Sequence, residues 1–277
     1  MYKYKIYEKY GIKVLSFDSL EKAGGVIHCF TTRKGGVSEG HCNSLNFSKS
    51  RDSEPSNVNE NARRLAESLC LDYNKLTAVP QVHGCDVAVI DDENCGAGFS
   101  RSPFDRGYDA MITDVRGIPL MTLHGDCVPV FLYDPVRRAI GMVHSGWRGT
   151  EKRIAARAVE KMKQVYGCNG ENIIAAIGPA IEMDCFEVDM PVYEALLRSF
   201  PEMAEDKTLA IDGNAPEKKH VSLTGLVRKA LLDCGVKKEN ISVSGICTCC
   251  EKNKEDYFSH RRTKGKTGIM AGVICLE

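Results

Sequence analysis

The stretch from residue 110 to residue 143 constrains the fold most strongly, because short apolar runs follow one another there with gaps too small for helices. The runs cover residues 110–113, 120–123, 128–133 and 139–143. Runs of this length, rich in aliphatic and β-branched residues, are typical of buried strands. Parallel neighbours need long crossover connections, so this part of the chain favours antiparallel pairing over a doubly wound parallel sheet.

Helical patterns and further strand-like runs surround this stretch. Strands are predicted at residues 25–31, 87–90, 173–177, 241–246 and 269–274. Apolar residues at helical spacing predict helices at 57–70, 192–199 and 223–234, and a further helix that is capped by Thr150 and runs to Gly167. Because no linker or internal repeat divides the chain, we expect a single domain over residues 1–277, with an α+β fold of mixed β-sheets flanked by helices.

Charge and cysteine content restrict the partners and the compartment. The chain has 37 basic and 37 acidic residues, so its net charge of zero provides no long-range attraction to nucleic acid or to an anionic membrane. No apolar run reaches the ~20 residues that a membrane span needs. The 13 cysteines are odd in number and irregularly spaced, and the N-terminus lacks a secretory pattern. We therefore expect a cytoplasmic protein with a small-molecule ligand.

Two histidines and a cysteine stand beside glycine-containing turns at the ends of predicted strands. They are His83, Cys127 and His144. Two imidazoles and a thiolate suit Zn²⁺ or copper, and three protein ligands would leave a fourth position for water or substrate. On spacing alone the alternative is favoured, in which the histidines are hydrogen-bonded strand-end residues and the cysteine is a core thiol, because such triplets are common in a chain with 7 His and 13 Cys.

Basic residues also occur at turns that could hold an anion. Arg33 follows the first predicted strand, Arg148 precedes the helix at Thr150, and Arg261 precedes a glycine turn. A guanidinium beside backbone N–H groups at a helix start binds phosphate or carboxylate, whereas the competing interpretation is an ordinary solvated turn. The run Cys247-Thr248-Cys249-Cys250 has no second cysteine cluster to complete a metal site, so Cys249 and Cys250 are interpreted as structural.

A series of segments in a fixed order carries a resemblance to a known family. The segments are TTRKGGVS (31–38), SLN (44–46), NARRLA (61–66), QVHG (81–84), DAMIT (109–113), DCVPV (126–130), HSGWRG (144–149), AIGPAI (176–181), CFEV (185–188), CT (247–248) and FSHRR (258–262). Together they resemble the YfiH-like family, which was named multicopper polyphenol oxidoreductase (laccase) and is described as zinc-dependent purine nucleoside phosphorylases with adenosine deaminase activity.

The resemblance implies a ligand set and a substrate pocket. It makes His83, Cys127 and His144 the ligands of Zn²⁺, with Cu²⁺ as the alternative ion, and it places Arg33, Asn46 and Arg148 at the border of the same pocket. The sequence departs from the family pattern at His124-Gly125, Ser145 and His260. Strand alternation places His124 on the face opposite Cys127, so we do not expect His124 to bind the metal.

The implied activity is phosphorolysis of adenosine, inosine or methylthioadenosine to the free base and (methylthio)ribose 1-phosphate, with zinc-dependent adenosine deamination. Arg33, Asn46, Arg148 and Arg261 are the predicted substrate or phosphate-binding residues, and Asp126 is the predicted proton carrier beside the metal ligands. Three other functions stay open. They are a copper-dependent polyphenol oxidase, a metal-free hydrolase with Cys127 activated by a histidine, and a non-enzymatic module whose structural zinc takes a fourth ligand such as His124.

Overall fold

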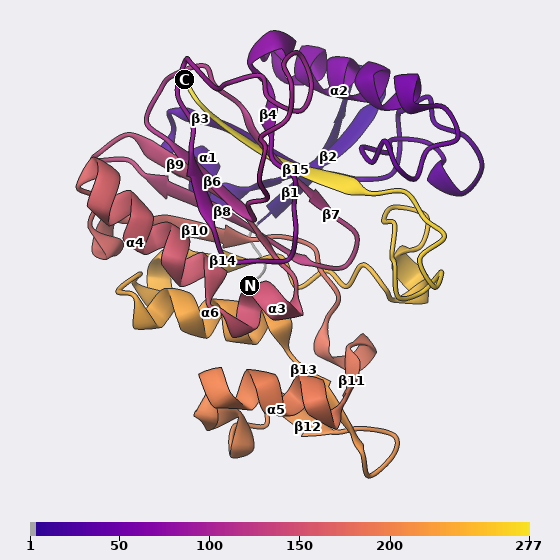
Figure 1. Cartoon of the computed structure of the whole chain (residues 1–277), viewed down its shortest axis with the longest axis vertical. Coiled ribbons are helices and arrows are strands. Elements are labelled where there is room, and N and C mark those ends of the chain that lie inside the picture. The colour runs from indigo at the N-terminus through magenta and orange to yellow at the C-terminus, as the bar shows by residue number, and fades with distance from the viewer. Residues whose placement is uncertain (1–3) are drawn as a thin grey trace.

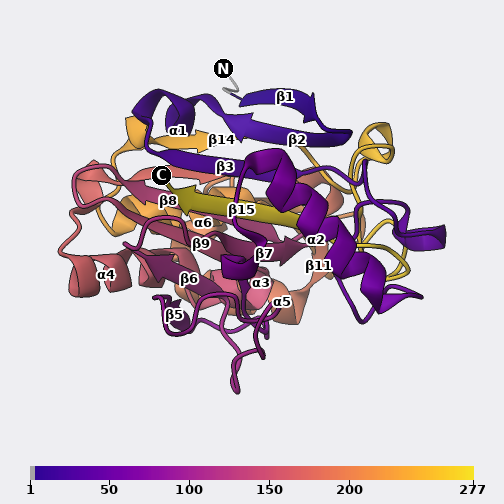
Figure 2. The same ribbon diagram turned by 90° about the horizontal axis from the view of Figure 1, so that it is seen from above.

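Two six-stranded sheets packed face to face form the centre of the molecule, as the computed structural model of the chain shows for residues 4–277 (Figures 1 and 2). A smaller sheet of three strands lies apart from them, beside α5 (Figure 1). Parallel and antiparallel pairs occur within both large sheets. The α+β fold with mixed sheets is therefore confirmed.

The first large sheet has the strand order β1-β2-β3-β15-β7-β4. Its strands are β1 (Tyr4–Lys9), β2 (Ile12–Phe17), β3 (Val26–Thr31), β15 (Met270–Leu276), β7 (Leu120–His124) and β4 (Thr77–Ala78). β15 comes last along the chain and pairs antiparallel with both β3 and β7. The C-terminal strand therefore connects the N-terminal hairpin to the rest of this sheet.

The second large sheet has the order β14-β10-β8-β9-β6-β5. Its strands are β14 (Ile241–Val243), β10 (Ile174–Ile177), β8 (Val128–Asp134), β9 (Ala139–Ser145), β6 (Ala110–Thr113) and β5 (Val87–Val89). The four runs predicted between residues 110 and 143 are all strands, but they do not form one sheet. β7 belongs to the first sheet and β8 to the second, so the chain crosses between sheets in the short turn that contains Cys127.

Three of the six helices within residues 4–277, α2, α4 and α6, cover the outer faces of the two large sheets. The helices are α1 (Asp18–Ala23), α2 (Pro55–Leu69), α3 (Trp147–Glu151), α4 (Ile154–Tyr166), α5 (Met190–Ser199) and α6 (Leu223–Asp233). α2 packs on the first sheet, and α4 and α6 pack on the second (Figure 2). Within β8, Phe131 faces the first sheet while Val130 and Leu132 face the helices, as the alternation of a strand requires.

The predicted helix from Thr150 to Gly167 is two helices. Thr150 lies inside α3, whose N-cap is Gly146, and α4 begins only at Ile154. Arg153 separates them in a left-handed conformation with φ of 59°. The predicted cap at Thr150 is therefore wrong, because a single left-handed residue breaks the helix where no glycine or proline marks the break in the sequence.

Several elements of the structure have no counterpart among the predicted ones. They are β1, β2, α1, β4, and the small sheet formed by β11 (Glu187–Asp189), β12 (Ala210–Asp212) and β13 (Lys218–Val221). β1 is mostly exposed, and charged residues and tyrosines make up most of it, so it lacks the apolar run of a buried strand. Among residues 4–277, no helix combines the length and the apolar character that crossing a membrane requires.

Candidate functional site

His83, Cys127 and His144 meet at the edge where the chain passes between the two large sheets. His83 lies in the loop between β4 and β5, Cys127 lies in the turn from β7 to β8, and His144 lies near the end of β9. We call these three residues the mixed site. His83 is exposed, Cys127 is half-buried and His144 is buried. One side of the site is therefore open to solvent, and the other is fixed in the sheet.

The donor atoms of the mixed site suit one metal ion. They all lie within 4.8 Å of one another, and the Cys127 Sγ is 3.9 Å from the His83 Nε2. A tetrahedral zinc at ordinary bond lengths would hold a sulfur and a nitrogen about 3.6 Å apart. The observed separation of Cys127 and His83 is slightly longer than this. Three protein ligands, one of them exposed, are typical of a site that leaves a position for substrate.

Asp109 holds the two histidines of the mixed site in place. Its Oδ1 accepts hydrogen bonds from the His144 Nδ1 at 2.8 Å and from the backbone N–H of His83 at 3.0 Å, while its Oδ2 accepts the N–H groups of Val82 and Gly84. The bond to Nδ1 leaves the His144 Nε2 available toward Cys127. A carboxylate that orients a ligating imidazole in this way is a common feature of metal sites.

Charge coupling makes Cys127 unusually acidic and His144 unusually basic. Burial acts to raise the pKa of Cys127, but the His144 and His83 imidazoles outweigh it and lower the pKa to about 6. Burial acts to lower the pKa of His144, but the Cys127 thiolate and the Asp109 carboxylate raise it to about 9. The thiol is therefore ready to ionise at neutral pH, as both a metal ligand and a nucleophile require.

His124 is close to the mixed site but is not available as a ligand. Its ring centroid is 5.3 Å from that of His144, while its Nδ1 lies 3.1 Å from the Cys127 carbonyl oxygen and its Nε2 lies 2.8 Å from the Thr122 hydroxyl. Both ring nitrogens therefore have protein partners. The expectation that His124 does not bind the metal agrees with this geometry, although engaged nitrogens, and not simple strand alternation, provide the reason.

The backbone around the mixed site is tightly constrained. His83 and Asp126 have left-handed φ angles of 58° and 93°, which are unfavourable for residues with a side chain. A Cβ at Gly146 would lie 2.8 Å from the His83 Cδ2 and 3.1 Å from the Cys127 Sγ. Glycine is therefore required at position 146, since a methyl group would push two of the three donors aside.

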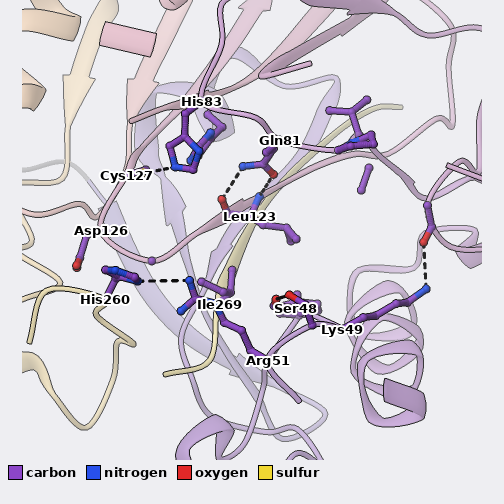
Figure 3. Close-up of a pocket in the computed structure, with 18 of the residues that line it drawn as sticks. Ser48, Lys49, Arg51, Gln81, His83, Leu123, Asp126, Cys127, His260 and Ile269 are labelled. Carbon is purple, nitrogen blue, oxygen red and sulfur yellow. Dashed lines mark hydrogen bonds between the residues drawn. The ribbon is translucent and has the colours of Figure 1, made fainter. Parts of the chain in front are cut away.

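A cavity of about 850 Å³ opens beside the mixed site (Figure 3). This volume lies within the usual range for small-molecule pockets. Figure 3 shows His83 beside Cys127, and separately the contact between His260 and Arg51. The wall also has an apolar part, formed by Phe47, Val58, Val79, Phe99, Leu123, Ile181, Phe186 and Ile269.

The polar part of the cavity wall is rich in positive charge. It includes Lys49, Arg51, Arg148 and Arg261. Lys49, Arg51 and Arg261 donate hydrogen bonds to backbone carbonyls, and the Arg148 guanidinium stacks on the Trp147 ring at 4.2 Å. Because these partners are neutral and the four cations outnumber the Asp126 carboxylate on the same wall, the cavity keeps a local positive charge that suits a phosphate or carboxylate, in a chain with no net charge.

Arg33 and Asn46 do not line this cavity, which differs from the prediction that they border it. Arg33 donates to the carbonyls of Asn43 and Lys254 and stacks over the Phe258 ring at 4.5 Å. Asn46 is fully buried, and its Oδ1 accepts the N–H groups of Ser48 and Ile269. Both side chains hold loops in place, and Asn46 fixes the segment that brings Ser48 and Arg51 to the cavity.

Asp126 lines the cavity, but its carboxylate is fully engaged. Its Oδ1 accepts a hydrogen bond from the Thr248 hydroxyl at 2.7 Å, and its Oδ2 accepts from the Ser259 hydroxyl at 3.0 Å and from the Arg261 N–H at 2.7 Å. A carboxylate that accepts three hydrogen bonds in a residue that is only 7% exposed is typical of a structural role. The geometry therefore does not favour the predicted proton-carrying role, and Asp126 instead links the turn of Cys127 to the C-terminal loops.

The sequence reasoning did not single out Asp109, Gln81 or Arg51 as site residues. The Gln81 side chain bonds both the N–H and the carbonyl of Leu123, which attaches the His83 loop to β7. Asp109 and Gln81 do lie within two of the quoted segments, DAMIT and QVHG. Arg51 lies in none of them, and only the fold brings it to the cavity.

The fold and the mixed site define a class of protein that has one open metal-binding position beside a cationic small-molecule cavity. Residues 27–277 match the model of the family described as Multi-copper polyphenol oxidoreductase laccase, and the chain belongs to this family. The resemblance stated from the sequence is thereby confirmed.

Individual relatives cover most of the chain. "Purine nucleoside phosphorylase YlmD" of Bacillus subtilis is 34% identical over 91% of this chain and 89% of its own length. "Adenosine deaminase RL5", from an unknown prokaryotic organism, is 35% identical over 75% of this chain and 76% of its own length. The crystal structure of YlmD from Geobacillus stearothermophilus superposes with a TM-score of 0.88 at 32% identity and covers 100% of both chains.

Proposed function

We propose that this chain is a zinc-dependent purine nucleoside phosphorylase that also deaminates adenosine. The observation that carries the proposal is the open mixed site at the wall of a cavity lined by uncompensated cations. The relatives add support, because one is named a purine nucleoside phosphorylase and another an adenosine deaminase. Adenosine, inosine and methylthioadenosine are the proposed nucleosides, and phosphate is the second substrate.

Phosphorolysis requires phosphate to be held under the anomeric carbon while negative charge develops on the leaving base. Arg148 and Arg261 supply guanidinium groups on the cavity wall, and Arg51, which also lines the cavity, is the third proposed phosphate-binding residue in place of Arg33. The aromatic rings of Phe99 and Phe186 provide an apolar surface for a purine. The cavity can thus take both the charged and the flat part of the substrates.

The residues of the mixed site fit a zinc ion, which would supply Lewis acidity at the open side of the cavity. His83, Cys127 and His144 would hold it, and Asp109 would keep the His144 Nε2 directed toward it. Copper would use the same three donors. The chain's own contribution is to keep Cys127 ionised, to exclude His124 from the ligand set and to leave the exposed side free.

A metal-free hydrolase is the second candidate function. The observation that favours it is the acidic Cys127 beside the basic His144, which is also the arrangement of a thiolate nucleophile. The module with a structural zinc is less well supported. Within residues 4–277 the group of donors at this place consists of His83, Cys127 and His144, and His124 does not complete it.

The test is incubation of the purified chain with adenosine, with and without phosphate, followed by chromatography for adenine and inosine. Phosphate-dependent adenine and phosphate-independent inosine are expected. The Cys127→Ala variant should lose both by about 100-fold or more, equivalent to about 3 kcal/mol of transition-state stabilisation. Cys70→Ala, at an exposed cysteine away from the cavity, is the matched control. Unchanged activity in Cys127→Ala, or no activity in the zinc-loaded parent, would refute the proposal.

A further inference from the structure

A second group of thiols converges in the structure, and it does not belong to the mixed site. Cys185 ends the 3₁₀ turn Met183–Cys185, Cys247 forms an isolated bridge with Ala180, and Cys250 precedes the 3₁₀ turn Glu251–Asn253. We call Cys185, Cys247 and Cys250 the thiol cluster. Their three Sγ atoms lie within 4.8 Å of one another, and those of Cys185 and Cys250 are 3.6 Å apart. The interpretation of Cys250 as merely structural therefore needs revision.

The sulfur spacing matches a shared metal ion better than a disulfide. Thiolates bound at about 2.3 Å to one tetrahedral ion lie about 3.8 Å from each other, close to the observed 3.6 Å. A disulfide would need a sulfur separation of about 2.0 Å and would use only two of the three thiols. A metal ion uses all three.

A backbone N–H group and two guanidinium groups lie around the thiol cluster. The Glu182 N–H donates to the Cys247 Sγ at 3.4 Å. The Arg262 guanidinium donates to the carbonyls of Thr248 and Cys249, and Arg261 donates to the carbonyl of Cys185. These contacts fix the two turns that carry the cysteines and place positive charge near them. Outer contacts of this kind orient ligands and stabilise a thiolate–metal unit.

We propose that Cys185, Cys247 and Cys250 form a second metal site that takes one thiophilic ion of the Zn²⁺ or Cu⁺ class. Soft thiolate ligands select such ions. Binding replaces the thiol protons, which pass to solvent, and involves no change of oxidation state. The site is independent of the proposed function, because none of its three ligands lines the cavity.

Hydrogen bonds connect the segments of the thiol cluster to the cavity wall. Thr248, which follows Cys247, donates its hydroxyl to Asp126, and Arg261 joins the Cys185 carbonyl to the cavity wall. An ion held by Cys185, Cys247 and Cys250 would tie the 183–185 turn to the 247–250 turn. The second metal would thereby stabilise the wall that carries Asp126 and Arg261 without contacting substrate.

The experiment is loading of the full chain with cadmium, followed by elemental analysis and cadmium NMR. The parent protein should bind two equivalents and give two signals, one from a sulfur-rich ligand set and one from a mixed sulfur and nitrogen set. Cys185→Ser and Cys250→Ser should each lose the sulfur-rich signal alone, and Cys127→Ser should lose or shift only the other. Cys70→Ser is the control and should keep both. Zinc and Cu⁺ titrations then identify the preferred ion.

Three results would overturn the second site. The first is a parent protein with a single equivalent and no sulfur-rich signal, and the second is an intact sulfur-rich signal in both Cys185→Ser and Cys250→Ser. A Cys185–Cys250 disulfide, seen as a loss of two hydrogens in the mass of protein purified without reductant and never exposed to metal, would also contradict it. Thermal unfolding of each variant establishes that a missing signal does not come from a missing fold. Activity toward adenosine is a separate readout, so failure here leaves the phosphorylase proposal untouched.

Discussion

The mixed site and the thiol cluster both bring donors from distant segments together, but they differ in ligand type and in setting. The mixed site combines two imidazoles with one sulfur and opens on a cavity through the exposed His83. The thiol cluster has three sulfurs, and its ligands lie outside the cavity lining. Of these two groups that could hold a metal ion, the mixed site is therefore the one arranged to meet a substrate, because its open side lies next to the cations of the cavity.

The groups that surround the donor atoms also differ between the mixed site and the thiol cluster. A carboxylate, Asp109, supports the mixed site and raises the basicity of His144. Backbone N–H and guanidinium groups surround the thiol cluster. A carboxylate strengthens an imidazole ligand and tunes a reactive ion, whereas N–H donors to sulfur stabilise a charge that does not react. The Asp109 carboxylate can be removed by a substitution that leaves the thiol cluster unchanged, which makes the comparison testable.

Asp109→Asn is expected to produce the largest difference in metal affinity between the two sites. The amide would place an NH₂ group toward N–H donors that now meet a carboxylate oxygen, and the orientation of His144 and of the His83 loop would be lost. Metal affinity at the mixed site should fall by about 10- to 100-fold, while the sulfur-rich cadmium signal remains. Competition with a chelator of known affinity measures this. Equal weakening of both sites would show that Asp109 acts on the fold as a whole.

Alkylation of metal-free protein should distinguish the thiols by their pKa. The pKa of Cys127 is lowered to about 6, so its thiolate is abundant above pH 6 and is lost as the pH falls below it. Iodoacetamide should therefore modify Cys127 about tenfold faster at pH 7 than at pH 5, apart from the reagent's own pH dependence. Burial and neighbouring thiols raise the pKa of Cys185 and Cys250, so these should react only in alkaline solution.

Peptide mapping by mass spectrometry assigns the modified cysteines, and Asp109→Asn provides the matched variant. Losing the carboxylate lowers the basicity of His144 and should shift the Cys127 profile toward higher pH. A Cys127 that reacts no faster at pH 7 than Cys185 would contradict the charge coupling described for the mixed site.

The smallest effect is expected from Cys185→Ser on catalysis. If the thiol cluster only stabilises the cavity wall, the variant should raise the KM for phosphate roughly twofold to fivefold and leave kcat nearly unchanged. Steady-state kinetics at saturating nucleoside measures this. A large fall in kcat would instead mean that the cluster takes part in the chemistry, and the contrast with the mixed site would disappear.

Much of the fold could be predicted from local pattern, because the buried strands are continuous apolar runs. Residues 128–133 and 139–143 correspond closely to β8 and β9. β1 and β13 escape prediction because lysines and other polar residues interrupt them, so neither strand contains an apolar run. The break between α3 and α4 at Arg153 could not be predicted, because no glycine marks it in the sequence.

Local sequence pattern predicts the candidate site less completely than it predicts the fold. The triplet His83, Cys127 and His144 was found through its family segments, since spacing alone favoured the opposite conclusion. Cys185 and Cys250 are separated by 65 positions, and nothing local indicates that their thiols meet. Arg33 lies in a glycine-rich basic turn much like that of an anion site, yet its guanidinium is used on carbonyls of neighbouring loops. Which basic side chains face a cavity is decided by tertiary packing.

The position of β15 has a consequence for how the protein is made. β15 is the last strand in chain order and separates β3 from β7 in the first sheet. During synthesis the early hairpin of β1 and β2 with β3 must wait for this strand before it can join β7, so the sheet has long-range contacts that form late. The turn of Cys127 follows β7 directly. One donor of the mixed site thus extends from a strand whose antiparallel partner, β15, comes much later in the chain.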